Sequence, residues 1–209
     1  MTAVRVLRPG RQARTARSRM TEAEFVAWAD EDTRAEWVDG EVILMSPDNV
    51  VHTRAGVFLL RLFSDFVEAR DLGAVFGPNY AARFGAPPRR RIPDVFFVAR
   101  SRLHLIGETG FEGAPDLIVE VVSPDSVKRD HREKYIEYQA AGVREYWLVD
   151  PGWKQAHAYT LARGRYKEIA EKDDVLHSIV LRGFFLKPEW LWQEPLPRLK
   201  DVRKELGLA

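Results

Sequence analysis

Residues 116–123 read Asp-Leu-Ile-Val-Glu-Val-Val-Ser and lie between Pro115 and Pro124. A short run of β-branched and aliphatic residues bounded by turn signals is typical of a strand that is buried on both faces of a sheet. Glu120 stands in the middle of this run. A buried charge is costly unless it is paired or binds a metal ion, so Glu120 is expected to have a specific partner.

The segments that follow this strand indicate an α/β fold. Asp125 or Ser126 can cap a helix that runs to Ala141, with Gly142 at its C-terminal end. Residues 145–149, which read Glu-Tyr-Trp-Leu-Val, are predicted to form another strand. A buried strand, a helix and a second strand in this order predict a parallel crossover.

Helices and strands are also predicted in the rest of the chain. Thr21 and Glu24 form a capping box that predicts a short helix, and Asp39-Gly40 between two alternating runs predicts a hairpin. A helix is predicted over residues 48–70, because apolar residues recur there at helical spacing. These residues are Val50, Val57, Leu60, Phe63 and Val67. Further strands are predicted at 74–84 and 94–99, and a terminal antiparallel meander at 153–160, 165–170 and 175–180. The expected architecture is a mixed central sheet flanked by helices, with a C-terminal antiparallel meander.

The composition favours one globular domain. The chain has 209 residues, of which 45% are hydrophobic, which is enough to bury a core. We expect a basic leader at 1–19, a domain at 20–195 and a C-terminal tail at 196–209. The absence of cysteine excludes disulfides and thiolate metal sites, and it is compatible with a cytoplasmic location. No apolar run approaches the roughly 20 residues that span a membrane, so no membrane association is expected.

The charge is unevenly distributed along the chain. Residues 1–19 hold six arginines and no acid, so the remainder has 26 basic and 31 acidic residues and a net charge of about −5. The domain itself is therefore not a generally basic nucleic-acid binder, although a local basic patch is compatible with this charge. The leader is interpreted as a disordered tail, as sequence upstream of a true start at Met20, or as a nucleic-acid-binding arm, and the first two readings are favoured.

Two carboxylates are expected to meet in the sheet. Side chains on one face of a strand alternate, so Asp116 and Glu120 share a face, while Asp94 begins the preceding strand. Carboxylates that converge in an apolar sheet raise each other's pKa unless a cation lies between them. Oxygen ligands suit Mg²⁺ or Mn²⁺. We therefore predict a metal site at Asp94 and Glu120, with Asp116 as a less favoured participant or a turn residue.

A lysine is expected near the same site. One stripe of the helix after residue 124 contains Val127, His131, Lys134, Tyr138 and Ala141. If this stripe faces the sheet, the Lys134 ammonium approaches the two carboxylates. There it can orient or deprotonate an attacking water, or stabilise charge on a phosphate. The alternatives are a solvated Lys134 and a role for Lys128 instead, while Tyr138 is interpreted as packing beneath the site.

The motifs together resemble a known family. They are Glu36-Trp-Val-Asp-Gly-Glu41, Ser46-Pro47, His52, Ile92-Pro93-Asp94-Val95, Pro115-Asp-Leu-Ile-Val-Glu120-Val-Val-Ser-Pro124, Lys134, Tyr138 and Gly142-Val-Arg-Glu-Tyr-Trp-Leu-Val-Asp-Pro151. In this order, over roughly residues 20–190, the chain resembles the Uma-type restriction-endonuclease family of the PD-(D/E)XK nuclease superfamily.

This resemblance implies a restriction-endonuclease-like core, a divalent metal (Mg²⁺ or Mn²⁺) and hydrolysis of nucleic-acid phosphodiesters, with DNA as the expected substrate. Asp94 and Glu120 match the two family acids, and the backbone carbonyl of Val121 would complete the protein ligands. The superfamily lysine belongs two residues after the glutamate, where this chain has Val122. The Uma-type branch moves the lysine to the following helix, where Lys134 matches. A homodimer is expected only by analogy with related nucleases.

Three further positions are candidates with open alternatives. Glu36 adds a carboxylate to the site or forms a cross-strand pair. His52 is a site residue or a helix-capping histidine. The run Arg89, Arg90 and Arg91 lies in a predicted loop before Asp94, where it contacts phosphates or is a solvated run of charge.

The predicted function is that of a metal-dependent endonuclease. Two other functions are compatible with the same motifs. One is a binding or scaffold domain that keeps the nuclease fold without catalysis, which the acidic domain and the displaced lysine allow. The other is a metal-dependent hydrolase of a different substrate.

Overall fold

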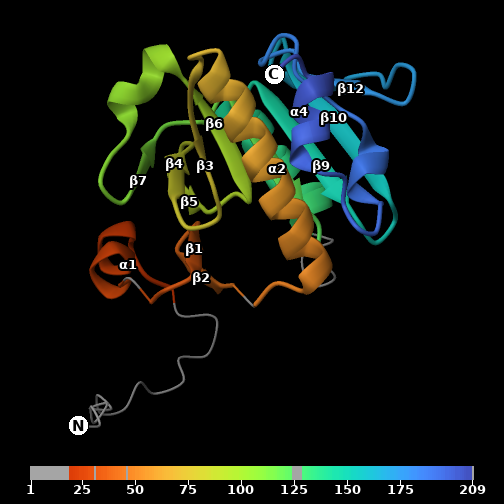
Figure 1. The fold of residues 1–209 in the computed structure, drawn as a ribbon. Helices are drawn as coiled ribbons and strands as arrows, with labels where there is room; N and C mark the ends of the chain where they lie inside the picture. Colours follow the sequence, from red (N-terminus) through yellow and green to blue (C-terminus); the bar gives the residue numbers. More distant parts are fainter. Residues whose placement is uncertain (1–18, 31, 46, 124–128, 209) are drawn as a thin grey trace, which may run out of the picture.

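A six-stranded mixed sheet runs through the centre of the computed structural model (Figure 1). Its order is β11-β10-β9-β8-β6-β3. The strands are β3 (Gly73–Phe76), β6 (Val95–Ala99), β8 (Leu117–Val121), β9 (Glu145–Asp150), β10 (Gln155–Ala162) and β11 (Arg165–Glu168). Strands β8 and β9 pair in parallel, and the other neighbours are antiparallel. The parallel pair confirms the predicted crossover, and the mixed sheet confirms the predicted fold class.

The structure describes residues 19–30, 32–45, 47–123 and 129–208. Several sequence predictions fall outside them: residues 1–18 of the leader, Ser46 of the family motif, the helix start at Asp125 or Ser126, and the positions of Val127 and Lys128. The side chain of His131 also lies outside the described part.

A second, five-stranded sheet has the order β2-β1-β5-β4-β7. Its strands are β1 (Ala35–Val38), β2 (Glu41–Leu44), β4 (Ala81–Phe84), β5 (Arg89–Arg91) and β7 (Gly110–Glu112). The β1–β2 hairpin is confirmed, because Asp39 and Gly40 have the positive φ values, 50° and 87°, of a type I′ turn. The single strand predicted at 74–84 is wrong: it divides into β3 and β4, which belong to different sheets.

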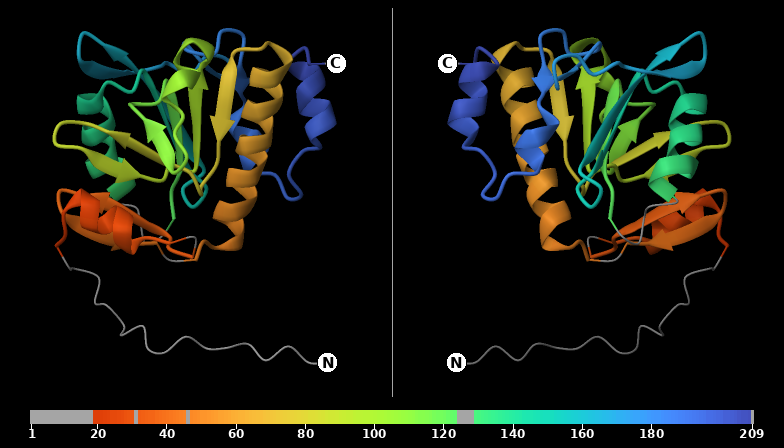
Figure 2. Two further views of the ribbon diagram at one scale, coloured as in Figure 1. Left: turned by 90° about the vertical axis from the view of Figure 1, so that its left-hand side faces the viewer. Right: turned by 90° about the vertical axis from the view of Figure 1, so that its right-hand side faces the viewer.

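Helices cover the two faces of the central sheet, as Figure 2 shows. One face packs against α2 (Val50–Ala69) and α4 (Leu199–Glu205), and the other against α3 (Tyr135–Ala141). A π-helical segment, η2 (Arg129–Lys134), leads into α3, and α1 (Glu22–Trp28) begins with the predicted capping box. Short 3-10 segments are η1 (Arg100–Leu105) and η3 (Pro188–Leu191).

Only part of the apolar pattern that predicts α2 is buried in the structure. Val50 and Val57 are 68% and 50% exposed, while Leu59, Leu62 and Phe66 are fully buried against the sheet. Apolar residues occur on both faces of this helix, so their spacing predicts a helix without showing which side packs inward. The exposed valines remain on the surface near the N-terminal half of α2.

The C-terminal region also departs from the predicted meander. Strands β10 and β11 confirm its first two strands. The third is wrong, because β12 (Leu176–His177) pairs with β13 (Phe185–Leu186) in a separate two-stranded sheet. Residues 196–208, expected as a tail, include α4 and contribute Val202, Leu206 and Leu208 to the same core as α2. In the described part of the chain, no helix combines the length and apolarity needed to cross a membrane.

Candidate active site

Asp94 and Glu120 come from neighbouring strands. Strands β6 and β8 pair antiparallel with Val95 opposite Val119, so Asp94 and Glu120 are the next pair in this register. Phe96 and Ile118, two residues from each acid, lie in the core cluster on the α3 side. Side chains alternate along a strand, so both acids lie on that side as well. The two carboxylates are 8% and 2% exposed.

Glu120 has two donors from the helical segment that follows its strand. Lys134 Nζ lies 2.8 Å from Glu120 Oε2, and the Tyr138 hydroxyl donates to Glu120 Oε1 at 2.5 Å. Lys134 is 4% exposed. The stripe that contains Lys134 and Tyr138 therefore faces the sheet, as its spacing predicts. Tyr138 also packs edge-on against Phe84 and Tyr146, so it contributes both to the core and to the polar site.

Asp94 is held by the backbone and by His52. The Val121 N–H donates to Asp94 Oδ2 at 2.7 Å, and His52 Nε2 lies 3.2 Å from the same oxygen. His52 belongs to the first turn of α2, where the Asn49 side chain accepts a hydrogen bond from its backbone N–H. The helix-capping residue is thus Asn49, and the His52 side chain contacts Asp94.

The charge around His52 favours its protonated form. Burial lowers the pKa of His52, but the hydrogen bond and charge of Asp94, together with the charges of Asp48 and Glu120, raise it above its ordinary value. The neighbouring carboxylates outweigh desolvation because they favour the imidazolium directly. The contact with Asp94 therefore favours a protonated His52 on this side of the site.

Glu36 forms a cross-strand ion pair. Its Oε2 accepts from Arg91 Nη1 at 2.6 Å, and its Oε1 accepts from the Ile92 N–H at 3.1 Å. Arg91 in turn donates to both oxygens of Glu137 at 2.7 and 2.8 Å. Burial raises the pKa of Glu36, but the charges of Arg91 and Lys134 bring it down to about 2. Glu36 is therefore an ionised partner of Arg91 in a buried network that reaches the helix of Lys134.

The arginine run is placed differently from the prediction. Arg89, Arg90 and Arg91 form strand β5, so the predicted loop is wrong. Arg89 Nη2 donates to Asp39 at 2.8 Å, and Arg90 Nε donates to Glu22 at 2.9 Å. Each guanidinium of the run is thus already paired with a carboxylate of this chain.

Asp116 lies at the other end of β8 from Ser123. It is 2% exposed, its Oδ2 accepts from the Ala99 N–H at 2.9 Å, and it forms an ion pair with Arg102 at 3.1 Å. These contacts join the start of β8 to the end of β6. Asp116 is therefore a structural residue of the sheet.

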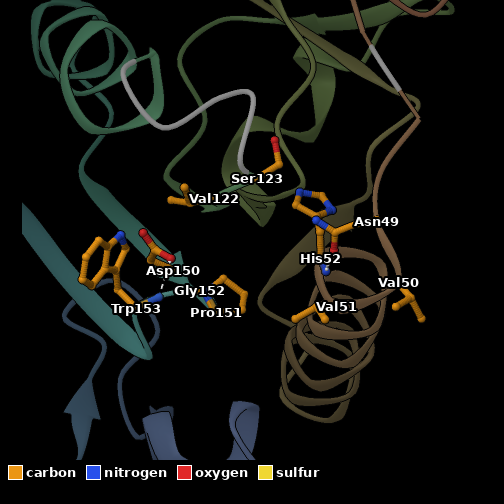
Figure 3. A pocket seen from close by; sticks show the side chains of 10 residues that line it. All are labelled: Asn49, Val50, Val51, His52, Val122, Ser123, Asp150, Pro151, Gly152 and Trp153. Carbon is orange, nitrogen blue, oxygen red and sulfur yellow. Dashed lines mark hydrogen bonds between the residues drawn. The ribbon is translucent and has the colours of Figure 1, made fainter.

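A cavity of about 500 Å³ opens beside His52 (Figure 3). It is lined by Asn49, Val50, Val51, His52, Val122, Ser123, Asp150, Pro151, Gly152 and Trp153. Its walls include the residues that follow the parallel strands β8 and β9, which is where α/β sheets commonly bind ligands. Trp153 is 75% exposed at its rim. The strand predicted at 153–160 begins instead at Gln155, and Trp153 lies in the turn after β9, where Asp150-Pro151-Gly152 is a turn signal in the sequence.

The donors present suit a hard divalent cation. Among the described residues, no three His, Asp or Glu side chains converge as a preformed metal site. The two carboxylates of Asp94 and Glu120 lie on adjacent strands, and within the described part no protein donor contacts Asp94 Oδ1. A cation held by two carboxylates, a backbone carbonyl and waters matches the ligands that Mg²⁺ and Mn²⁺ take. The residues therefore fit such an ion as a partial ligand set.

A mixed sheet, two acidic residues from adjacent strands and a lysine from the next helix together define an α/β protein of the restriction-endonuclease-like class. Residues 22–189 match the model of the Uma2 family, described as "Putative restriction endonuclease". The chain belongs to this family, which confirms the resemblance in its motifs and supports a nuclease-type function.

A solved structure shares the fold. It is the crystal structure of "a putative nuclease belonging to DUF820" from Anabaena variabilis, with a TM-score of 0.70 and 18% sequence identity. The match covers 83% of this chain and 97% of that chain. No curated protein matches this sequence.

Proposed function

We propose that this protein is a metal-dependent endonuclease that hydrolyses phosphodiester bonds of DNA. The observation that carries the proposal is the 2.8 Å contact between Lys134 Nζ and Glu120 Oε2, on the same side of the sheet as Asp94. A lysine and two acids in one buried site can hold a divalent cation and stabilise charge on a phosphate. The neighbouring cavity is lined by His52, which contacts Asp94.

Asp94, Glu120 and the Val121 carbonyl would hold Mg²⁺ or Mn²⁺. When bound, such an ion polarises the phosphoryl group and lowers the pKa of a coordinated water. Lys134 would orient the attacking water or stabilise charge on the phosphate. His52 would hold the Asp94 carboxylate in place through its 3.2 Å contact. Glu36 would act as a positioning residue, because it orients Arg91, which holds Glu137 on the helix of Lys134.

The proposal is tested by incubating supercoiled plasmid and single-stranded DNA with Mg²⁺ or Mn²⁺. The unsubstituted protein should cut at least one of them, and EDTA should stop the reaction. Asp94→Asn and Lys134→Ala should each lower the rate by roughly 100-fold or more, as expected for loss of an electrostatic group at the reacting centre. Asp173→Asn and Lys167→Ala, at exposed positions, are the matched controls. Cleavage that persists in Asp94→Asn would assign the activity to another site.

A binding or scaffold role without catalysis is the second candidate. It is favoured by one observation: both oxygens of Glu120 already meet protein donors, so the carboxylate is compensated in the buried site without a cation. Calorimetric titration with Mn²⁺ separates the two functions. Binding that disappears in Glu120→Gln supports the nuclease, whereas no binding together with metal-independent retention of DNA supports the scaffold. Cleavage of a simple phosphodiester such as bis(4-nitrophenyl) phosphate, but not of nucleic acid, would indicate a hydrolase of another substrate.

A further inference from the structure

An exposed face of α2 combines valines and arginines. Val50, Arg54, Val57 and Arg61 follow one another at spacings of four, three and four residues, so they lie on one side of the helix. All four are exposed, and this side is distinct from the one that packs Leu59, Leu62 and Phe66 into the core. Val50 also lines the cavity beside His52, so the exposed face begins at the candidate active site.

A second cavity of about 400 Å³ lies along this face. It is formed between α2 and the segment before α4, and its lining residues are Thr53, Arg54, Val57, Phe58, Arg61, Leu196, Pro197, Arg198 and Leu199. Three of these carry guanidinium groups, and we call the cavity with Arg54, Arg61 and Arg198 the arginine groove.

The guanidinium groups of the groove are accessible. Arg54 donates to Glu194 at 2.8 and 2.9 Å, but the Glu194 side chain is 77% exposed, so the pair is weak and open to competition. Within the described residues, no ion pair or hydrogen bond engages the side chain of Arg61 or Arg198. The arginines of β5 differ, because each of them donates to a carboxylate in the fold.

We propose that the arginine groove binds the sugar–phosphate backbone of the nucleic acid next to the bond that is cut. This inference rests on the proposed function. Arg54 and Arg61 are seven residues apart, or about 10 Å along the helix, which is comparable with the rise over three nucleotides of a B-DNA strand. Guanidinium groups match phosphate geometry, and the apolar residues between them present no side chain suited to reading base edges. The groove therefore supplies affinity and register without sequence specificity.

The charge of the groove favours nucleic acid over a second copy of the chain. Residues 20–209 carry a net charge of about −5, so three accessible arginines form a local positive site on an acidic domain. A two-fold interface is self-complementary and would bring this positive site against its own copy, with repulsion between the arginines. Phosphates have the complementary charge.

Binding is measured by fluorescence anisotropy of labelled single-stranded and duplex oligonucleotides in EDTA and again with Ca²⁺, over a series of salt concentrations. The groove variant is Arg54→Gln/Arg61→Gln/Arg198→Gln. The control variant, Arg163→Gln/Arg165→Gln/Arg182→Gln, removes the same charge from three exposed arginines elsewhere. We expect the groove variant to bind at least about 10-fold more weakly and to lower the salt slope by roughly two to three, as for three lost phosphate contacts. The control variant should keep the original slope.

Each other outcome is informative. If oligonucleotide binding weakens equally in both variants, the loss is explained by net charge alone and the inference is overturned. Unchanged binding in the groove variant would also overturn it, even with Asp94-dependent cleavage intact. Sedimentation is run in parallel, and a change from dimer to monomer with unaltered binding would show a self-association surface instead. Groove-dependent binding without any cleavage would leave the groove supported and overturn only the proposed nuclease.

Discussion

Tyr138 shows how a single hydroxyl can support a buried charge. It donates to Glu120 Oε1 at 2.5 Å inside a fully buried site. Tyr138→Phe keeps the ring and removes the donor, so Glu120 loses part of its compensation. We expect the free energy of unfolding to fall by about 1–3 kcal/mol, measured by urea denaturation. Tyr159→Phe is the control, because no described residue forms a hydrogen bond with that hydroxyl. Equal losses in both variants would contradict a specific role for the Tyr138 donor.

The lowered pKa of Glu36 predicts that the stability of the fold depends on pH. Its pKa is about 2 in the folded protein, against an ordinary value of 4.5. A depressed carboxyl pKa stabilises the fold fully above the unfolded value, and this contribution is lost as the pH falls from about 4.5 toward 2. Glu36→Gln should therefore cost about 3 kcal/mol at pH 7, as expected for breaking a buried ion pair. The difference between the two proteins should shrink below pH 4.5 in urea denaturation, and a constant difference from pH 7 to 3 would contradict the assignment.

Residue-scale predictions succeeded where local spacing decided the outcome. Lys134 and Tyr138 are four residues apart, and residues at this spacing are neighbours on a helix surface. Both side chains therefore reach Glu120 from the same side of the helix. The arginine run shows the opposite case. Charge alone suggests a solvated loop at 89–91. In the structure Arg91 donates hydrogen bonds to Glu36 and Glu137, which are 55 and 46 residues away in the sequence.

At the scale of elements, α4 stabilises the fold by covering α2. Leu206 is 4% exposed and belongs to the core cluster that includes Leu59 and Phe66. Leu206→Ala should lower the free energy of unfolding by about 2–4 kcal/mol, because it leaves a cavity in that core. Lys200→Ala, at an exposed position of α4, should change it by less than about 0.5 kcal/mol. Similar values for the two variants would show that α4 is only loosely attached to α2.

The helices and strands are predicted best where a turn or helix cap has a defined residue signature. The capping box at Thr21 and the hairpin at Asp39-Gly40 appear where expected, because both depend on backbone hydrogen bonds or φ values within a few residues. The run at 74–84 is predicted as one strand although Gly77-Pro78-Asn79, a turn signal, divides its two apolar halves. Its division between two sheets depends on separate partners, β6 for one half and β5 with β7 for the other.

For the whole molecule, we propose that the leader is not required for folding. The core clusters of the described residues are formed by residues from Met20 onward. A chain that begins at Met20 should therefore unfold at the same temperature as the full chain, measured by circular dichroism. If its oligonucleotide binding also keeps the same salt slope, the reading as a nucleic-acid-binding arm is contradicted. A lowered unfolding temperature would instead show that the leader contributes to the fold.

The sequence by itself determined the buried strand at 116–123, the charged Glu120 in its middle, the parallel crossover and the helical stripe that contains Lys134. These follow from local periodicity and turn chemistry, which act within a few residues. Only the tertiary structure decided which side of α2 is buried, that Arg89–Arg91 are paired inside the domain, and that Trp153 lies at the rim of a cavity beside His52. Those outcomes depend on contacts between distant segments, whose geometry is set by the packing of two sheets and not by the order of residues along either one.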